Sequence, residues 1–311
     1  MGRLSVRQLL VISYKLLSTT NPIFFTTQNP ETQNTKNTMN ELFSIKGKVI
    51  VVTGAMGVLA NSLSHYFAEQ GARVVFLDLP RIEDKLKATV EKARLKSPEC
   101  IYCTGSVLER ASLEGARDVI LQKFGRIDAL INGAGGNMAG AIVQPTDSFF
   151  NLDYAQWRAV IDLNLGGTLL PILVLAKVFE QQKHGVIMNF SSMSAQSALT
   201  RVFGYSNSKA GVDNLTKWLA VEFAQKIGEG VRVNAIAPGF FIGEQNRALL
   251  TNPDGSYTQR GQTVIKKTPV GRFGIPEDIF GTSHFLISDA AKFVTGTIIP
   301  IDGGFSAFTG V

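Results

Sequence analysis

The chain has 311 residues, 45% of them apolar, and a formal net charge of +6. This length permits one large α/β domain or two small ones, with ample apolar sequence for a core. The first 38 residues carry half of the net charge, and the rest mixes both signs without a basic run that contains aromatic residues, which argues against a nucleic-acid partner. An anionic small substrate is compatible with this composition.

Residues 1–38 do not have the pattern of a folded domain. An apolar stretch is interrupted by Lys15, and the sequence that follows is polar and rich in turn-forming residues. The segment is too short and too interrupted for a membrane span, and it has no small-residue cleavage site of a targeting peptide. We expect a disordered N-terminal extension, which a start codon assigned upstream of Met39 would also explain.

From Lys46 onward the pattern alternates strands and helices. The apolar run 48–54 predicts a strand buried on both faces, the spacing over 57–71 predicts a helix, and 72–78 predicts a second strand. The first turn of such a βαβ unit binds a pyrophosphate. Gly54 permits the sharp turn, Gly57 lets the backbone approach phosphate, and Ala60 is small enough for helix–strand packing.

Asp78 ends the second predicted strand, 24 residues after Gly54. A carboxylate there accepts hydrogen bonds from the adenosine ribose and repels a 2′-phosphate, so it favours NAD(H) over NADP(H). Arg81 weakens this preference, because a cation nearby could receive that phosphate. An ordinary exposed aspartate at a strand end is the alternative.

Further helices are expected over 81–95, 110–124 and 154–182, the last with a kink at Pro171, and further strands over 100–104, 128–132, 185–190, 230–239 and 296–304. The two cysteines, Cys100 and Cys103, are expected to be ordinary strand thiols rather than metal ligands. The long connection 240–261 is typical of a lid over a site. These elements predict one doubly wound α/β Rossmann domain over 39–311, with about seven parallel strands and helices on both faces.

Tyr205 and Lys209 are four residues apart, so a helix would place both on one face, and Ser192 precedes Tyr205 by 13 residues. An ammonium near a phenol favours the phenolate and lowers the pKa of the tyrosine, which suits proton exchange with an oxygen on a carbon that gains or loses hydride. A serine hydroxyl can hold that oxygen in place. A chance pair on a helix surface is the alternative.

At these residues the chain resembles the short-chain dehydrogenase/reductase family, whose Ser, Tyr-x-x-x-Lys and upstream Asn form the active site. The resemblance implies catalytic roles for Asn164, Ser192, Tyr205 and Lys209. Asn164 in the family supports a water that relays protons, although a purely structural bond is the alternative for a buried asparagine.

The resemblance also implies a nicotinamide cofactor. Its expected binding residues are Gly54, Met56, Gly57, Val58, Leu59, Asp78, Ser106, Val107, Asn132, Gly133, Ala134, Tyr205, Lys209, Pro238, Gly239 and Phe241. The chain departs from the family pattern at three points. In the first turn, Gly57 comes one position early and Ala60 replaces the third glycine. Ser106-Val107 replaces Asp-Val beside the adenine, and Gly243 replaces a threonine that holds the cofactor, so the backbone of Phe241 and Ile242 would contribute more to cofactor binding.

Several stretches, among them INGAGGN and IPIDGGFSAFTGV, resemble the bacterial subgroup described as D-mannonate oxidoreductases or fructuronate reductases. This resemblance implies an anionic sugar acid as substrate, whose carboxylate suits a two-point bond to a guanidinium. Arg247 and Arg201 are the preferred candidates, ahead of Arg272, and Asn137 and Gln245 are candidates for the sugar hydroxyls.

Other readings of the sequence remain open. A polyol dehydrogenase or a 3-oxoacyl reductase would use the same frame, and a non-catalytic nucleotide-sensing protein is a candidate from another class. The resemblance further implies a homotetramer formed through the Asn164 and Tyr205 helices, and the scarcity of cysteine suits the cytoplasm. The sequence leaves open the exact substrate, the direction of the reaction and the arginine that binds a carboxylate.

Overall fold

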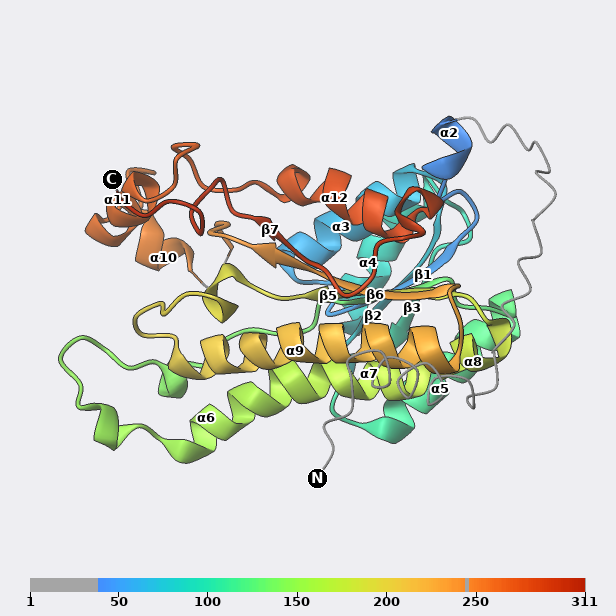
Figure 1. Cartoon of the computed structure of the whole chain (residues 1–311), viewed down its shortest axis with the longest axis horizontal. Helices are drawn as coiled ribbons and strands as arrows, with labels where there is room; N and C mark the ends of the chain where they lie inside the picture. Colours follow the sequence, from blue (N-terminus) through green and yellow to red (C-terminus); the bar gives the residue numbers. More distant parts are fainter. Residues whose placement is uncertain (1–38, 244–245, 311) are drawn as a thin grey trace, which may run out of the picture. The chain divides into compact units, whose positions relative to one another are not determined.

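Seven parallel strands form one sheet in the order β3-β2-β1-β4-β5-β6-β7 (Figure 1). The computed structural model describes residues 39–243 and 246–310, so the extension expected over 1–38 and the candidate Gln245 lie outside the described residues. The strands are β1 Val49–Thr53, β2 Arg73–Asp78, β3 Ile101–Thr104, β4 Ala129–Asn132, β5 Gly185–Phe190, β6 Val231–Pro238 and β7 Ile298–Ile301. The predicted Rossmann architecture is confirmed.

Two layers of helices cover the sheet, as Figure 1 shows, with α3, α4 and α12 on one face and α5, α7 and α9 on the other. Side chains along each strand alternate between the two cores: Ile50 and Val52 of β1 face the first layer, and Val49 and Val51 face the second. The helices are α2 Met39–Leu42, α3 Val58–Glu69, α4 Glu83–Arg94, α5 Arg110–Phe124, α6 Tyr154–Ile161, α7 Gly167–Leu175, α8 Phe179–Gln182, α9 Phe203–Lys226, α10 Arg247–Leu250, α11 Gln259–Lys266 and α12 Phe280–Ile287.

The helical stretch 154–182 is irregular, but not at the position that the sequence suggested. A π-helical segment, Asp162–Gly166, separates α6 from α7, whereas Pro171 lies inside α7. The proline ring crowds the carbonyl of the residue four positions earlier, so the disturbance lies before Pro171 rather than at it. The stretch is long and apolar enough to cross a membrane, but half of its most apolar window is buried inside the protein, and α7 contributes to the second core. It is a core helix.

The two cysteines point to opposite faces of the sheet. Cys100 immediately precedes β3 and belongs to the first core, while Cys103 lies in β3 and belongs to the second. Both are free and buried, and burial raises the pKa of the Cys103 thiol to about 11. Cys103 is thus the strand thiol that was expected, whereas Cys100 lies just before the strand.

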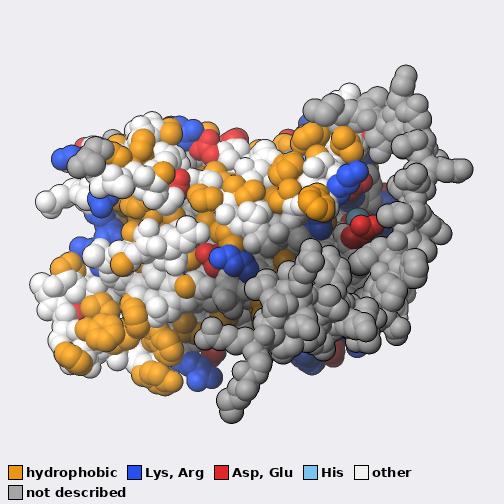
Figure 2. Space-filling model, viewed as in Figure 1, with side chains coloured by type: hydrophobic (Ala, Val, Ile, Leu, Met, Phe, Trp, Pro, Cys, Tyr) orange, Lys and Arg blue, Asp and Glu red, His pale blue; other side chains and the backbone are white. Residues whose placement is uncertain are grey.

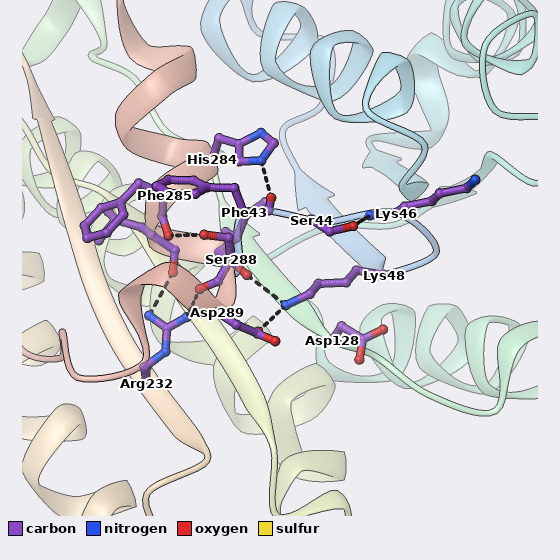
Figure 3. A network of polar contacts seen from close by, with 12 residues as sticks. Phe43, Ser44, Lys46, Lys48, Asp128, Arg232, His284, Phe285, Ser288 and Asp289 are labelled. Atoms are coloured by element: carbon purple, nitrogen blue, oxygen red, sulfur yellow. Dashed lines mark hydrogen bonds and ion pairs between the residues drawn. The ribbon is translucent and has the colours of Figure 1, made fainter. Parts of the chain in front are cut away.

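A polar network fixes the segment after α12 to the amino-terminal side of the sheet (Figure 3). The Arg232 guanidinium donates to the carbonyls of Leu286 and Ser288 at 2.8 and 3.0 Å. Lys48 Nζ lies 2.7 Å from Asp289 Oδ1. Arg232 is nearly buried, and burial lowers its pKa to about 10. The network stabilises the edge opposite to the one where ligands bind, and it holds the chain that leads into β7.

The long connection after β6 folds into a small unit of its own. It contains α10 and α11, and a bridge pairs Thr251 with Tyr257. Leu250, Val264 and Phe273 form a separate small core beneath these helices. The connection is therefore a packed helical cover rather than a structureless loop.

Candidate active site

A cavity of about 720 Å³ opens at the carboxyl ends of the central strands. Its walls come from the β1–α3 turn, the ends of β4, β5 and β6, the start of α9, and the α10–α11 cover. Open α/β sheets bind their ligands at this edge. The predicted site residues among its lining are Met56, Gly57, Val58, Leu59, Gly133, Asn137, Ser192, Tyr205, Lys209, Pro238, Gly239 and Phe241.

Ser192, Tyr205 and Lys209 meet in this cavity. Ser192 follows β5, and its Oγ accepts hydrogen bonds from Ser194 N and Ser194 Oγ at 3.2 and 3.0 Å. Because Ser192 Oγ acts as the acceptor in both, its own proton is free to be donated. One turn along α9 from Tyr205, Lys209 extends Nζ to a point 5.5 Å from the centre of the Tyr205 ring. The expected convergence of phenol, ammonium and hydroxyl is present.

Burial dominates the acid–base properties of the pair. It raises the pKa of the Tyr205 phenol, and the hydrogen bond with Ser192 lowers that pKa by less. This direction is opposite to the one expected from a neighbouring ammonium alone. Burial lowers the pKa of Lys209 to about 8, against a smaller raising effect of Asp213. Asp213 in turn accepts a hydrogen bond from Ser191, so a carboxylate that the sequence did not single out lies behind the lysine.

Asn164 lies in the π-helical segment, fully buried, and its side chain does not line the cavity. Its Oδ1 accepts from Gly136 N at 3.0 Å, and its Nδ2 donates to Gly136 O and Val160 O at 2.7 and 2.9 Å. The amide is thus saturated by bonds that clamp the loop after β4. The backbone carbonyl of Asn164 accepts from Thr168 Oγ1 at 2.7 Å.

The first turn of the βαβ unit is built around two close approaches. Gly54 has φ +61°, and a Cβ there would lie 2.5 Å from Ala134 Cα, so only glycine fits. The methyl group of Ala60 would lie 3.0 Å from a Cβ built on Gly133. Alanine is therefore tolerated at the third position of the turn because the residue that faces it is a glycine.

The N-terminus of α3 is directed at the cavity. Gly57 is the N-cap without a side-chain cap, and Val58, Leu59 and Ala60 of the first turn line the cavity. The first N–H groups of a helix have no intrahelical partner, and together with the helix dipole they bind phosphate. Across the cavity, a Cβ on Gly135 would lie 3.5 Å from Lys209 Nζ, so bare backbone leaves room beside the lysine. These residues fit a dinucleotide.

The model of the family described as enoyl-(acyl carrier protein) reductase matches residues 54–306. The chain belongs to the short-chain dehydrogenase/reductase family. Members of this family are oxidoreductases, and this chain is accordingly a nicotinamide-dependent oxidoreductase that acts on CH–OH groups.

Relatives of this family member include an uncharacterised oxidoreductase, UxuB, of Bacillus subtilis, which is 41% identical over 277 residues, 86% of this chain and 98% of the relative. A crystal structure from Haemophilus influenza with bound NAD, provisionally named a D-mannonate oxidoreductase, is 38% identical with a TM-score of 0.76, over 86% and 98% of the two chains. A gluconate 5-dehydrogenase of Burkholderia cenocepacia in complex with NADP and tartrate is 28% identical with a TM-score of 0.75, over 86% and 99%.

Several residues expected to bind the cofactor of this dehydrogenase make contacts outside the cavity. Asp78 Oδ2 accepts from Met56 N at 2.8 Å and Oδ1 from Leu79 N at 2.8 Å, so its carboxylate is fixed beside the first turn. Asn132 Nδ2 donates to Asn189 Oδ1 at 2.9 Å, between neighbouring strands, and its own Oδ1 has no partner among the described residues.

Two further expected residues precede α5. Ser106 Oγ accepts from Leu108 N at 3.2 Å, and the methyl of Val107 lies 2.9 Å from a Cβ built on Gly167. The Val107 side chain therefore packs against α7. Ala134 N donates to Thr53 Oγ1 at 3.3 Å, which closes the β4 loop onto the first turn. Contacts of Ser106, Val107 and Ala134 with a cofactor remain predictions.

The structure distinguishes the candidate substrate-binding residues by whether they line the cavity and whether they already have partners. Asn137 lines the cavity, and its buried Oδ1 has no hydrogen-bond partner among the described residues. Arg272 is engaged by both oxygens of Asp278, at 2.6 and 2.8 Å, which removes it as a free guanidinium. Arg247 begins α10 but does not line the cavity. Arg201 lies four residues before Tyr205 with φ +77°, an unusual conformation for a residue with a side chain. Like Arg247 it does not itself line the cavity, although its neighbours Leu199 and Val202 do.

Two residues of the cover were missed in the sequence. Arg260 of α11 lines the cavity. Asn246 also lines it, accepts from Gly243 N at 2.8 Å and donates to Phe241 O at 2.8 Å. Asn246 thus fixes the backbone that follows Pro238-Gly239, where the family has a threonine. Nothing in the sequence near Arg260 or Asn246 distinguishes them from surface residues of a loop.

Proposed function

We propose that the protein is an NAD(H)-dependent oxidoreductase that interconverts D-fructuronate and D-mannonate. The observation that carries the proposal is the Ser192–Tyr205 pair in a cavity that also holds the unpaired Oδ1 of Asn137. A buried acceptor without a donor favours a ligand that brings hydroxyl groups. The Haemophilus structure of the same fold, with its D-mannonate oxidoreductase name, supports this choice of sugar acid.

The cofactor, when bound, supplies the hydride to the substrate carbonyl carbon or accepts it from the alcohol. In the reductive direction Ser192, which already accepts from Ser194, donates a hydrogen bond to the C5 carbonyl oxygen and positions it while keeping its own proton. Tyr205 is protonated at neutral pH because burial raises its pKa, so it can donate the proton that the forming alkoxide needs.

The remaining residues act behind Tyr205. Lys209 would hold the nicotinamide ribose, and its charge would stabilise the Tyr205 phenolate that is left after proton transfer. A water held at the Asn164 carbonyl would reprotonate Tyr205. The helical irregularity at 162–166 favours such a water, because π-helical segments disturb the regular pairing of carbonyls.

The preference for NAD(H) is part of this proposal. Asp78 is held at the end of β2 by backbone N–H groups of Met56 and Leu79, so its negative charge cannot easily turn away from the ribose of a bound adenosine. A 2′-phosphate there would meet a carboxylate. Arg81, three residues after Asp78, is exposed.

The direct test is NADH oxidation by the purified protein with D-fructuronate, beside D-tagaturonate, D-fructose and an acetoacetyl thioester, each repeated with NADPH. The proposal requires turnover of D-fructuronate with NADH that exceeds all other combinations. Turnover of D-fructose without turnover of either uronate would instead identify a polyol or sugar dehydrogenase. Turnover of the thioester alone would identify a 3-oxoacyl reductase.

We also propose a cytoplasmic homotetramer. Figure 2 shows hydrophobic side chains gathered at the lower left, where Figure 1 places the start of α6. Phe150 and Tyr154 are 95% and 68% exposed there, and Trp218 on α9 is 59% exposed. Aromatic surface of this kind is enriched at protein interfaces. Light scattering of the purified protein tests the assembly, and a monomer at micromolar concentration would contradict it.

A further inference from the structure

Among the residues that the structure describes, the cavity is lined by cations and by no carboxylate. Lys209 and Arg260 are its charged lining residues among the described residues, and neither an aspartate nor a glutamate joins them. The Lys209 ammonium is already held by the Phe190 carbonyl at 2.7 Å. Arg260 is therefore the cation at this cavity whose charge has no evident task in the catalytic group.

Arg260 stands where a basic residue is unfavourable. It is the second residue of α11, whose N-cap Thr258 accepts from Gly261 N at 3.1 Å. A cation in the first turn of a helix opposes the helix dipole. The side chain is half-buried, and within the described ranges it makes no ion pair with a carboxylate. Such a charge needs compensation that this part of the chain does not provide.

A second arginine lies close by. The positive charge of Arg201 lowers the pKa of Arg260, in addition to a larger effect of burial. Arg201 adopts φ +77°, which costs about 1 kcal/mol for a residue other than glycine. Its carbonyl accepts from Val143 N at 3.1 Å, and the adjoining residues Ile142 and Val202 line the cavity. Strained backbone of this kind is often found at binding sites, and here it lies beside residues that line the cavity.

We propose that Arg201 and Arg260 form a clamp for the carboxylate of the substrate. Two guanidiniums within electrostatic reach of one another repel, and an anion between them would remove that repulsion and pair with both. Arg201 precedes Tyr205 by one turn of chain, on the side of the cavity formed by Ile142, Leu199 and Val202, so the clamp lies beyond the reacting carbonyl rather than at the phosphate-binding end of α3. The clamp deepens the function proposed above and rests on it.

Because Arg260 belongs to the α10–α11 cover and Arg201 to the body of the domain, the carboxylate would also join the two walls of the cavity. Phe240, which follows β6, and Phe305 near the C-terminus pack against the small core of the cover, so the cover is a fixed wall that presents Arg260 to the cavity.

The test uses two variants and one matched control. Arg260→Met removes one guanidinium and keeps most of its apolar stem, and Arg201→Asn removes the other while asparagine tolerates the positive φ. Lys266→Met removes one positive charge from an exposed position of the same helix α11 and serves as the control. For each protein we would measure kcat and KM for D-fructuronate and D-fructose, and the Kd of NADH by fluorescence.

We expect the KM for D-fructuronate to rise about 10- to 100-fold in each arginine variant relative to the KM for D-fructose, as is typical for loss of a charge-assisted hydrogen bond. The Kd of NADH should stay within about twofold of the wild type. A KM ratio that changes no more than in Lys266→Met would overturn the clamp. A weakened Kd of NADH by the same factor would also overturn it, since Arg260 would then bind a cofactor phosphate.

A second measurement separates the clamp from the proposed reaction. The inert acid D-gluconate is titrated calorimetrically into the enzyme–NADH complex, which needs no turnover. Loss of D-gluconate binding in both arginine variants but not in Lys266→Met supports the clamp even if D-fructuronate is not reduced. Unchanged D-gluconate binding in Arg260→Met, with D-fructuronate reduced by the wild type, contradicts the clamp and leaves the proposed function standing.

Discussion

Lys209 donates a hydrogen bond from Nζ to the carbonyl oxygen of Phe190 at 2.7 Å. This bond joins the middle of the site helix α9 to the last residue of β5, and it keeps the ammonium inside the protein, where burial lowers its pKa to about 8. The charge that the catalytic group relies on can therefore be lost within an accessible pH range.

The first prediction concerns this charge and the rate. We expect kcat/KM for carbonyl reduction to fall as the pH rises through about 8, because neutral Lys209 no longer stabilises the Tyr205 phenolate. Rates recorded from about pH 6 to about pH 10 test this. A profile that stays level to pH 9.5, with NADH still saturating, would mean that Lys209 keeps its proton or is not needed.

The second prediction concerns the same group and stability. The folded-state pKa of Lys209 lies below the ordinary value of 10.5, so between about pH 8 and that value the unfolded chain binds more protons. The free energy of unfolding that Lys209 contributes should therefore increase with pH across this window. Urea titrations of the wild type and Lys209→Met should diverge in that direction, and parallel pH dependences would contradict the assignment.

The third prediction addresses the acid. Tyr205→Phe removes the hydroxyl and keeps the ring, so we expect kcat to drop by about 10²–10⁴-fold while NADH binds as in the wild type. Tyr257→Phe provides the control, because Tyr257 lies in the cover outside the cavity lining. If Tyr205→Phe keeps most of the activity, the proton comes from another group.

The fourth prediction addresses the cofactor. Asp78→Asn keeps an oxygen that can accept from Met56 N but removes the negative charge, so NADPH should be used better and the ratio of kcat/KM for NADH over NADPH should fall about tenfold or more. Asp84→Asn, an equal loss of charge at an exposed position of α4, should leave the ratio unchanged. Equal ratios in the two variants would show that Asp78 does not select the cofactor.

The fifth prediction compares two glycines. Gly54→Ala should lower the free energy of unfolding by about 2–4 kcal/mol, because its Cβ would strike Ala134 and its φ is positive. Gly115→Ala on α5, where nothing lies within 4 Å of the added carbon, should raise that free energy by about 0.5–1 kcal/mol. Thermal unfolding measures both, and a Tm of Gly54→Ala at or above that of the wild type would refute the argument from close approach.

Local periodicity predicted the fold well, because the information it needs lies within each segment. The strands over 185–190 and the helix over 110–124 have the predicted bounds, since a run buried on both faces or a helical stripe with a glycine at its end leaves little choice. The irregularity near Pro171 was misplaced because the effect of a proline falls on the carbonyl one turn earlier.

The catalytic residues could be recognised in the sequence, because Tyr205 and Lys209 lie one turn apart on one helix and Ser192 lies at the end of a strand. The second guanidinium of the proposed clamp could not be recognised. Arg260 meets the surroundings of Arg201 only after a cover of its own folds over the cavity, and such a contact between segments about 60 residues apart leaves no periodic trace. The pKa of Tyr205 was misjudged for a related reason: the sequence shows the neighbouring lysine but not how deeply the phenol is buried.

Ala60 and Gly133 share the space of a single methyl group where the first helix crosses the end of β4. The two positions therefore cannot diverge independently. A methyl group added at 133 should be damaging, because its Cβ would lie 2.8 Å from the backbone oxygen of Thr53 as well as 3.0 Å from Ala60, and glycine at position 60 would relieve only the second contact. Among related dehydrogenases, whether the third position of the phosphate turn must be glycine thus depends on the loop that faces it as well as on the nucleotide. The alanine at this position here is therefore compatible with an intact nucleotide site.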